Sequence, residues 1–256
     1  MDNKYKCVKI TKIITHNESN KTFIFDRSFD NVIPGQFAMV WLPGVDEKPI
    51  SFSAPDEITI KKIGPFTEKT FNLKEGDKLW LRGPYGKGYN NFEKPYYVFG
   101  GGCGIAPLKF FINKNIEKIK SIYLGCRSKT DVLFLKDFIQ LAEQNDIELN
   151  IFTEDGSFGK KGMIIDTDEE FSDKYNYAVC GPERMIKAVA DKINIPAQTY
   201  VSIERYMKCA IGLCGNCSFS GYRVCVDGPV FSYDIVKDLP HFCSKRRTRT
   251  GELVNI

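Results

Sequence analysis

The chain has 256 residues, of which 43% are hydrophobic and 27% charged, a balance typical of a globular protein. The 36 basic and 32 acidic residues leave a formal net charge of +4, which is too small to indicate a nucleic-acid-binding protein. Residues 1–17 lack the apolar core of a signal peptide, and no segment approaches the ~20 apolar residues of a membrane helix. We therefore expect a cytoplasmic protein that binds neither nucleic acid nor a membrane.

Up to about Asn90, the sequence predicts short β-strands. Turn signals such as Pro34-Gly35 and Pro55-Asp56 separate segments that are rich in β-branched and aromatic residues. These segments are residues 7–14, 21–26, 36–42, 57–63 and 77–83. Short strands at this spacing favour an antiparallel barrel or sandwich.

After Pro95, apolar strands alternate with helical patterns, which predicts a parallel α/β sheet. The expected strands are residues 96–99, 121–125, 148–153 and 177–180, and the expected helices are 108–116, 133–145 and 183–192. From Tyr200 onward the sequence is rich in cysteine and glycine and has no clear periodicity. The chain therefore divides into three units, at 1–92, 93–199 and 200–256.

Four of the nine cysteines fall within 17 residues, at Cys209, Cys214, Cys217 and Cys225. Because disulfides are rare in the cytoplasm, such thiols are metal ligands, redox groups or buried side chains. The spacing C-x4-C-x2-C…C is the plant-type spacing for a 2Fe–2S cluster, whereas a zinc ribbon uses paired C-x2-C knuckles. Gly212 and Gly215 give the loop the backbone freedom to bring four thiolates together. The sequence predicts a 2Fe–2S cluster, with structural zinc and inert thiols as alternatives.

The remaining cysteines and the two histidines carry weaker signals. We expect Cys7, Cys126 and Cys243 to be small buried side chains. His16 and His241 do not lie beside a credible nucleophile, so both are expected to be ordinary surface residues.

A glycine run lies between a predicted strand and a predicted helix, in YVFGGGCGIAPL. Its members are Gly100, Gly101, Gly102 and Gly104. They would let a pyrophosphate approach backbone amides at a helix N-terminus. The full G-x-G-x-x-G pattern is absent, so a tight structural turn explains the run equally well.

Two further loops follow predicted strands. AVCGPERM places Cys180, Gly181 and Pro182 at the carboxyl end of a strand, where ligands bind in open α/β sheets. YLGCRSKTD places Arg127 and Ser128 after another strand, where they could hold a ribose or a phosphate. Three such loops in this order favour a nicotinamide dinucleotide site.

A hydride carrier and a one-electron cluster need a flavin between them. We expect the flavin in the barrel region, where Lys48 lies beside a strand that carries Ser51 and Ser53. A turn at Gly64 and Thr67 offers a second contact. The alternative is that these are solvent-facing strand residues.

Together these stretches resemble the ferredoxin–NADP reductase superfamily. Within it, the chain is most similar to the electron-transfer subunits of NAD-dependent (class 1B) dihydroorotate dehydrogenase. The flavin motif R-P-x-S of that family stands here as Lys48-Pro49-Ile50-Ser51, in which Lys48 keeps the charge of the arginine but loses its bidentate fork. A G-x-G-T-like turn stands at residues 64–67, and G-P-x-G at residues 83–86.

The nucleotide and cluster motifs of that family are also present. G-G-G-x-G-I-A-P stands at residues 100–107, C-G-P-E-x-M at 180–185, and V-C-V-D-G-P-V-F at 224–231. The resemblance implies an FAD-binding β-barrel domain at 1–92, an NAD-binding α/β domain at 93–199 and a 2Fe–2S domain at 200–256. It also implies that Cys180 lies near the nicotinamide, where it is the candidate catalytic residue.

The resemblance implies a function as well. Electrons from dihydroorotate oxidation in a partner FMN-containing TIM-barrel subunit would pass through the cluster and FAD to NAD⁺, in pyrimidine biosynthesis. The assembly would be a heterotetramer of two plus two. The preference between NAD and NADP stays open, because Arg127 could meet a 2′-phosphate or a ribose.

Two other functions remain open. Related subunits of sulfhydrogenase gamma, sulfite reductase or ferredoxin:NADP oxidoreductase type share the layout, and a zinc-loop interaction module without enzymatic activity is a different class. If electrons pass from the partner into the cluster, the apolar residues Ile211, Leu213 and Phe219 of the cysteine loop are expected at the surface against the partner. Packing of these residues over the cluster is the alternative.

Overall fold

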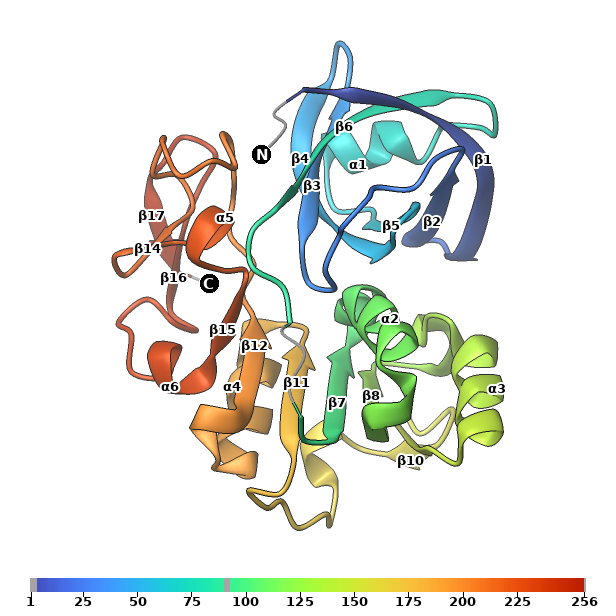
Figure 1. Ribbon diagram of the computed structural model, residues 1–256, viewed down its shortest axis with the longest axis vertical. Helices are drawn as coiled ribbons and strands as arrows, with labels where there is room; N and C mark the ends of the chain where they lie inside the picture. Colours follow the sequence, from blue (N-terminus) through green and yellow to red (C-terminus); the bar gives the residue numbers. More distant parts are fainter. Residues whose placement is uncertain (1–3, 90–92, 256) are drawn as a thin grey trace.

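A computed structural model describes residues 4–89 and 93–255 (Figure 1). A closed β-barrel lies at one end, an open sheet with helices lies at the other, and the C-terminal region runs along the side of both. The expected combination of an antiparallel barrel and an α/β sheet is confirmed. The predicted boundary at residue 92 lies outside the described residues.

The barrel closes in the order β1-β2-β5-β4-β3-β6, with antiparallel neighbours throughout. In β1, Val8 and Ile10 are fully buried while Lys9 between them is exposed, the period of two that a half-buried strand requires. A short helix, α1 (Pro65–Thr70), connects β5 to β6. The strands are β1 (Lys6–Asn17), β2 (Asn20–Phe25), β3 (Phe37–Leu42), β4 (Asp46–Ala54), β5 (Glu57–Lys61) and β6 (Lys78–Tyr85).

The open sheet has the order β10-β9-β8-β7-β11-β12-β15 and is parallel except for β15, which runs antiparallel to β12. From β7 the chain adds β8 and β9 on one side and β11 and β12 on the other, so the strand order reverses between β7 and β11. Ligands of open α/β sheets bind at such a reversal, beyond the carboxyl ends of the strands. The strands are β7 (Tyr96–Gly101), β8 (Ile119–Cys126), β9 (Glu148–Thr153), β10 (Lys160–Lys161), β11 (Asn176–Cys180), β12 (Thr199–Ser202) and β15 (Val230–Ser232).

The helices of this region are α2 (Ile105–Lys114), α3 (Leu135–Asn145) and α4 (Glu183–Ile193). α2 begins before the predicted 108, directly after a 3₁₀ turn of the glycine run. α3 begins two residues after the predicted start at 133. The backbone of Phe134 has the left-handed conformation, with φ 56°, so the helix can begin only after it. The 3₁₀ turns are η1 (Gly102–Gly104), η2 (Ile116–Lys118), η3 (Lys129–Asp131), η4 (Ile164–Asp166) and η5 (Pro196–Gln198).

The C-terminal unit, residues 203–255, folds into short elements around a small core. The basic residues Lys245–Arg247 form one strand of a hairpin near its C-terminal end. Because β12 and β15 belong to the open sheet, that sheet continues past residue 199. The elements are β13 (Ser218–Phe219), β14 (Tyr222–Arg223), α5 (Val224–Asp227), α6 (Tyr233–Val236), β16 (Lys245–Arg247) and β17 (Leu253–Asn255).

The three units share buried surface. One hydrophobic cluster contains Met39 of the barrel, Val179 of the sheet and Phe219 of the C-terminal unit. Helix α2 packs against β4, between the barrel and the sheet (Figure 1). No helix in the described part of the chain is long and apolar enough to cross a membrane.

Candidate functional site

The glycine run packs tightly against the loop that follows β11. Gly100 pairs with Cys180 in the strand register. A Cβ atom on Gly104 would lie 2.5 Å from the carbonyl oxygen of Cys180, and one on Gly101 would lie 2.2 Å from Sδ of Met185. Gly104 therefore requires glycine, because it faces backbone atoms, whereas the end of the Met185 side chain beside Gly101 could move. The alternative of a tight structural turn thus explains Gly104.

Gly102 is different. It has φ +52°, and a Cβ atom there would meet nothing within 4 Å. Open space therefore lies over this residue, just before the ten-residue helix α2. A helix N-terminus beside open space at a reversal of strand order suits a pyrophosphate.

The loop after β8 is adjacent, because β8 pairs with β7. Arg127 is exposed, and Ser128 bonds through its hydroxyl to Thr130 (2.8 Å) and Asp131 (3.0 Å). Asn17 of the barrel donates to the carbonyl of Thr130 at 2.9 Å. The strand order thus brings the three predicted nucleotide loops to one edge of the sheet, and the barrel braces one of them.

Cys180 lies at the carboxyl end of β11 and is 8% exposed. Burial raises the pKa of its thiol to about 12, and burial likewise raises the pKa of Cys103 to about 11. Both side chains are therefore neutral at physiological pH. A neutral thiol can pack against a cofactor ring, but it is a poor nucleophile.

The predicted flavin residues lie on β4. Nζ of Lys48 is 2.5 Å from Oδ2 of Asp46 and 3.2 Å from the hydroxyl of Tyr206, over whose ring it also lies. Pro49, Ile50 and Ser51 are half-buried and therefore accessible to a ligand. Ser53 differs, because it is fully buried and donates to Glu57 at 2.7 Å within the barrel.

Thr67 holds the turn at the start of α1. Its hydroxyl oxygen accepts from the amides of Ile63 (2.8 Å) and Gly64 (3.0 Å) and donates to the carbonyl of Gly64 (2.9 Å). A hydroxyl group can donate one hydrogen bond and accept two, so these three bonds use its full capacity. Thr67 therefore shapes this turn and has no hydrogen bond left for a flavin, whereas the Cβ direction of Gly64 is open.

The cysteine loop, residues 209–225, folds so that backbone amides point at sulfur. Sγ of Cys209 accepts from the amides of Leu213 at 3.3 Å and Cys214 at 3.4 Å. Gly212 and Gly215 are left-handed, with φ +80° and +68°, which glycine adopts without strain. Hydrogen bonds from backbone amides to a cysteine sulfur orient the thiolate for metal binding.

The four thiols form two pairs. The side chain of Cys209 interacts with that of Cys214, and Cys217 with Cys225. Among residues 4–89 and 93–255, no group of three or more His, Cys, Asp or Glu side chains is arranged to hold one metal ion. Structural zinc requires four ligands around one ion, whereas the two irons of a 2Fe–2S cluster share four thiolates. The plant-type spacing of the four cysteines therefore favours the cluster over zinc.

The environment of the loop favours thiolates. Burial opposes ionisation of Cys209, but the amides of residues 214, 211 and 213 outweigh it and lower its pKa to about 7. The hydrogen bond with Cys225 lowers the pKa of Cys217 to about 6 against the effect of burial, while the pKa of Cys225 is raised because its partner takes the charge first. Metal ligation needs deprotonated cysteines, so these shifts suit a cluster.

The loop is buried at its base and exposed at its tip. Cys217 and Cys225 are 2% and 1% exposed, whereas Leu213 is 80% exposed. The prediction that Phe219 is exposed is wrong, because it is fully buried beneath the guanidinium of Arg205. Ile211 is half-buried and packs against the same core.

Three other predictions need correction. His16 is not an ordinary surface residue, because Nε2 lies 2.8 Å from the hydroxyl of buried Thr22 and the ring packs on Phe134. Of the three cysteines expected to be buried, Cys126 is buried, while Cys7 and Cys243 are half-buried. Cys7 precedes the fully buried Val8 in β1 and therefore lies on the opposite, outer face of that strand. Sγ of Cys243 donates to the carbonyl oxygen of Glu183 at 3.1 Å.

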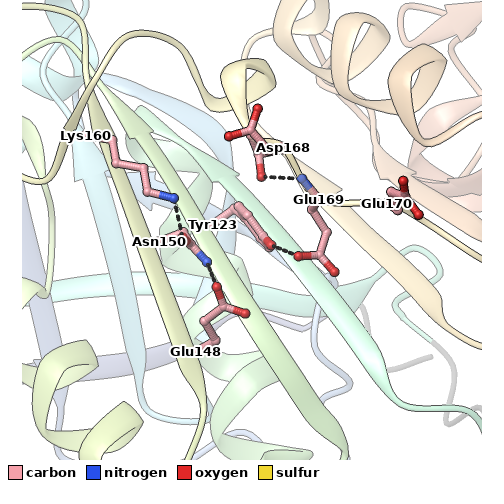
Figure 2. A pocket seen from close by; sticks show the side chains of 8 residues that line it. Tyr123, Glu148, Asn150, Lys160, Asp168, Glu169 and Glu170 are labelled. Atoms are coloured by element: carbon pink, nitrogen blue, oxygen red, sulfur yellow. Dashed lines mark hydrogen bonds between the residues drawn. The ribbon is translucent and has the colours of Figure 1, made fainter.

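A separate surface pocket of about 290 Å³ lies on the open sheet, between β8, β9, β10 and the loop before β11 (Figure 2). Glu169 accepts there from the hydroxyls of Tyr97 (2.8 Å) and Tyr123 (3.3 Å). Its lining carries the carboxylates of Glu148, Asp168, Glu169 and Glu170. These negative charges would repel the phosphates of a dinucleotide, so the pocket is not the nucleotide site.

The sequence did not predict two arginines, Arg82 and Arg205, that join the C-terminal unit to the barrel and to helix α4. Arg205, 4% exposed, forms an ion pair with Glu183 of the C-G-P-E motif and donates to the carbonyl of Glu204 at 2.7 Å. Arg82 of β6 donates to the carbonyl of Cys209 at 2.8 Å. The only signal in the sequence is their position beside motifs.

Comparisons with known proteins agree with this layout. A family model described as the iron-sulfur cluster binding domain of dihydroorotate dehydrogenase B matches residues 204–237, and an oxidoreductase NAD-binding domain model matches residues 98–191. Over 233 residues the chain is 44% identical to the probable dihydroorotate dehydrogenase B (NAD(+)), electron transfer subunit, of Thermococcus kodakarensis, covering 89% of this chain and 96% of that protein. The chain belongs to this family.

A second family member, from Methanocaldococcus jannaschii, is 42% identical over 258 residues and covers 96% of both chains. The dihydroorotate dehydrogenase B electron transfer subunits are thus related to this chain along nearly its whole length. The family predicted from the motifs is confirmed.

Solved structures share the fold. That of an NADH-dependent reduced ferredoxin-NADP oxidoreductase has a TM-score of 0.77 at 23% identity and covers 98% of this chain and 97% of that one. A ferredoxin NADP⁺ reductase from Neisseria gonorrhoeae, solved with bound FAD and NADP, has a TM-score of 0.63 at 17% identity, covering 77% and 98%. The barrel-and-sheet architecture of this electron transfer subunit is therefore the reductase fold.

Proposed function

We propose that this chain transfers electrons from dihydroorotate oxidation in a partner subunit to NAD⁺, within pyrimidine biosynthesis. The supporting observation is that the cysteine loop, with its two thiol pairs, is joined to the barrel strand that carries Arg82. A one-electron site and a candidate flavin site thus belong to one packed body.

Each unit has one binding task. Residues Lys48, Pro49, Ile50, Ser51 and Gly64 contact FAD, and Thr67 shapes the turn beside it. Gly100, Gly101, Gly102, Gly104, Arg127, Ser128, Gly181 and Pro182 form the NAD site. Cys209, Cys214, Cys217 and Cys225 hold the 2Fe–2S cluster. When bound, FAD accepts electrons in pairs or singly, and so links the hydride carrier NAD to the one-electron cluster.

Cys180 lies at the edge where the nicotinamide would meet the flavin. Its buried, neutral thiol packs against the ring and excludes water without carrying charge. Its role is therefore to position the nicotinamide rather than to attack it.

The partner is a catalytic subunit of FMN-containing TIM-barrel type, in a cytoplasmic assembly of two plus two. Residues 4–89 and 93–255 offer no credible dihydroorotate site of their own. The exposed tip of the cysteine loop at Leu213 is the place where the partner docks, because electrons must enter the cluster there.

A related reductase subunit of the ferredoxin:NADP oxidoreductase type is the second candidate, favoured by the likeness that covers nearly the whole chain. The two candidates differ in the partner that delivers electrons. Dihydroorotate-dependent NAD⁺ reduction on mixing with a TIM-barrel FMN subunit distinguishes them.

The test uses the purified, isolated chain. It should contain FAD, iron and acid-labile sulfide, and it should reduce an artificial acceptor with NADH but show no turnover with dihydroorotate. A colourless protein that contains zinc would support the interaction module. Oxidation of dihydroorotate by the chain alone would contradict the division between subunits.

A further inference from the structure

Arg82 on barrel strand β6 reaches the backbone of the cysteine loop. Its Nη1 donates to the carbonyl oxygen of Cys209 at 2.8 Å, and its Nη2 to the carbonyl of Lys208 at 3.1 Å. The side chain is 11% exposed. A barrel residue therefore holds the backbone of the first proposed cluster ligand.

The guanidinium is itself held in place. Nε and Nη2 donate to the two carboxylate oxygens of Glu47 at 2.7 and 2.8 Å, and Nη1 lies 3.3 Å from the hydroxyl of Tyr85. With the two loop carbonyls, these contacts use all five donors that an arginine has. Such a rigid fork fixes both partners, whereas a lysine could not reproduce it.

The strands that surround Arg82 carry the proposed flavin motif. Strand β3 pairs with β4 on one side, where Met39 faces Pro49, and with β6 on the other, where Met39 faces Arg82. Arg82 therefore lies two strands from Lys48-Pro49-Ile50-Ser51. Lys48 of that motif also reaches the C-terminal unit, at Tyr206, but Arg82 is the barrel residue that bonds to the carbonyl of Cys209 itself.

We infer that Arg82 is a positioning residue that fixes the cysteine loop against the flavin barrel and so sets the rate of single-electron transfer between FAD and the cluster. The inference rests on the proposed cluster and flavin sites. The overall balance is unchanged: NADH becomes NAD⁺ and a proton, and its two electrons pass singly to two molecules of a one-electron acceptor such as ferricyanide.

The experiment compares Arg82→Met and Arg82→Lys with the wild type, each loaded with FAD and cluster. Rapid mixing with NADH gives the rate of flavin reduction, and freeze-quench EPR gives the rate at which the cluster signal appears. In Arg82→Met we expect unchanged flavin reduction and cluster reduction that is slower by about tenfold or more, because both hydrogen bonds from Arg82 to the loop carbonyls are lost. Arg82→Lys keeps the charge but not the fork, so we expect a slower rate there too.

Arg27→Met is the matched control. It removes the same charge from the same barrel, but the Arg27 side chain is 53% exposed and its ion pair with the neighbouring Asp26 is long, at 3.7 Å. We expect both rates to stay at the wild-type level.

Wild-type cluster reduction in Arg82→Met, or an equal loss in the control, overturns the inference. If Arg82→Met loses its cluster, the test rests on Arg82→Lys. Cluster reduction at the wild-type rate in Arg82→Lys, with full cluster content, overturns the inference. A wild-type protein that binds no cluster contradicts the proposed function itself, and the inference with it.

Discussion

Lys109 of α2 holds both carboxylate oxygens of Glu57 on β5, with Nζ–Oε distances of 2.8 and 3.0 Å. The two side chains are only 15% and 8% exposed. The ion pair therefore joins the helix that follows the glycine run to the barrel.

Replacing Lys109 with Met should destabilise the protein by about 3–5 kcal/mol, because it leaves the buried Glu57 carboxylate without a positively charged partner. The measurement is the free energy of unfolding in denaturant. NADH-dependent flavin reduction should also slow, since α2 would no longer be braced against β5.

Lys187→Met is the control for that variant. Lys187 pairs with Asp191 at 2.6 Å, but the two side chains are 46% and 50% exposed, so the loss should stay below about 1 kcal/mol. Equal losses in the two variants would contradict the importance of the buried pair.

His16 should make the protein acid-sensitive. Burial and the charge of Lys109 lower its pKa, so the folded state keeps the ring neutral. Below about pH 6.5, where an unfolded histidine gains a proton, the unfolded state binds more protons and stability falls as pH falls. His16→Gln should flatten this dependence between pH 7 and pH 5.

The size of the effect is about 1.4 kcal/mol for each unit by which the two pKa values differ. Unfolding measured in denaturant across that range gives the comparison. Identical pH profiles for His16→Gln and the wild type would show that other groups cause the acid sensitivity. The neighbouring charges are Lys109, Glu57 and Asp137, which remain in both proteins.

Cys214→Ser should remove or destabilise the cluster while FAD stays bound, because the proposed flavin site lies on β4. Iron and sulfide analysis, together with the EPR signal of the reduced protein, reports the cluster. Cys7→Ser is the control, since Cys7 lies on β1 outside the cysteine loop. An unchanged rhombic signal in Cys214→Ser would show that Cys214 is not a ligand.

Leu213→Asp should weaken association with the catalytic subunit by about tenfold or more, since burial of a leucine is worth about 1.5–3 kcal/mol. Cluster content and NADH-dependent dye reduction should survive, because the side chain is 80% exposed in the single chain. Ile235→Asp, at a residue 43% exposed on α6, should leave binding unchanged. Loss of the cluster with the partner still bound would place Leu213 in the packing around the cluster instead.

The fold class, the family and the candidate sites could be predicted from the sequence, because the signals for them lie in short segments. Alternation of the kind seen at Val8 and Ile10 marks barrel strands, and the alternation of strands with helices marks the sheet. The spacing from Cys209 to Cys225 and the motif around Gly102 need only nearby residues to be recognised. Family and fold class follow from such patterns.

The tertiary structure decided which distant residues meet. Phe219 looks like an exposed loop residue in the sequence, but it is buried because Arg205 and the sheet cover it. The contact of Arg82 with Cys209 spans 127 positions, and strand order alone brings them together. Patterns in short segments cannot predict such pairs. The contacts between units form only when the barrel, the sheet and the C-terminal unit pack together and exclude water from the surfaces they share.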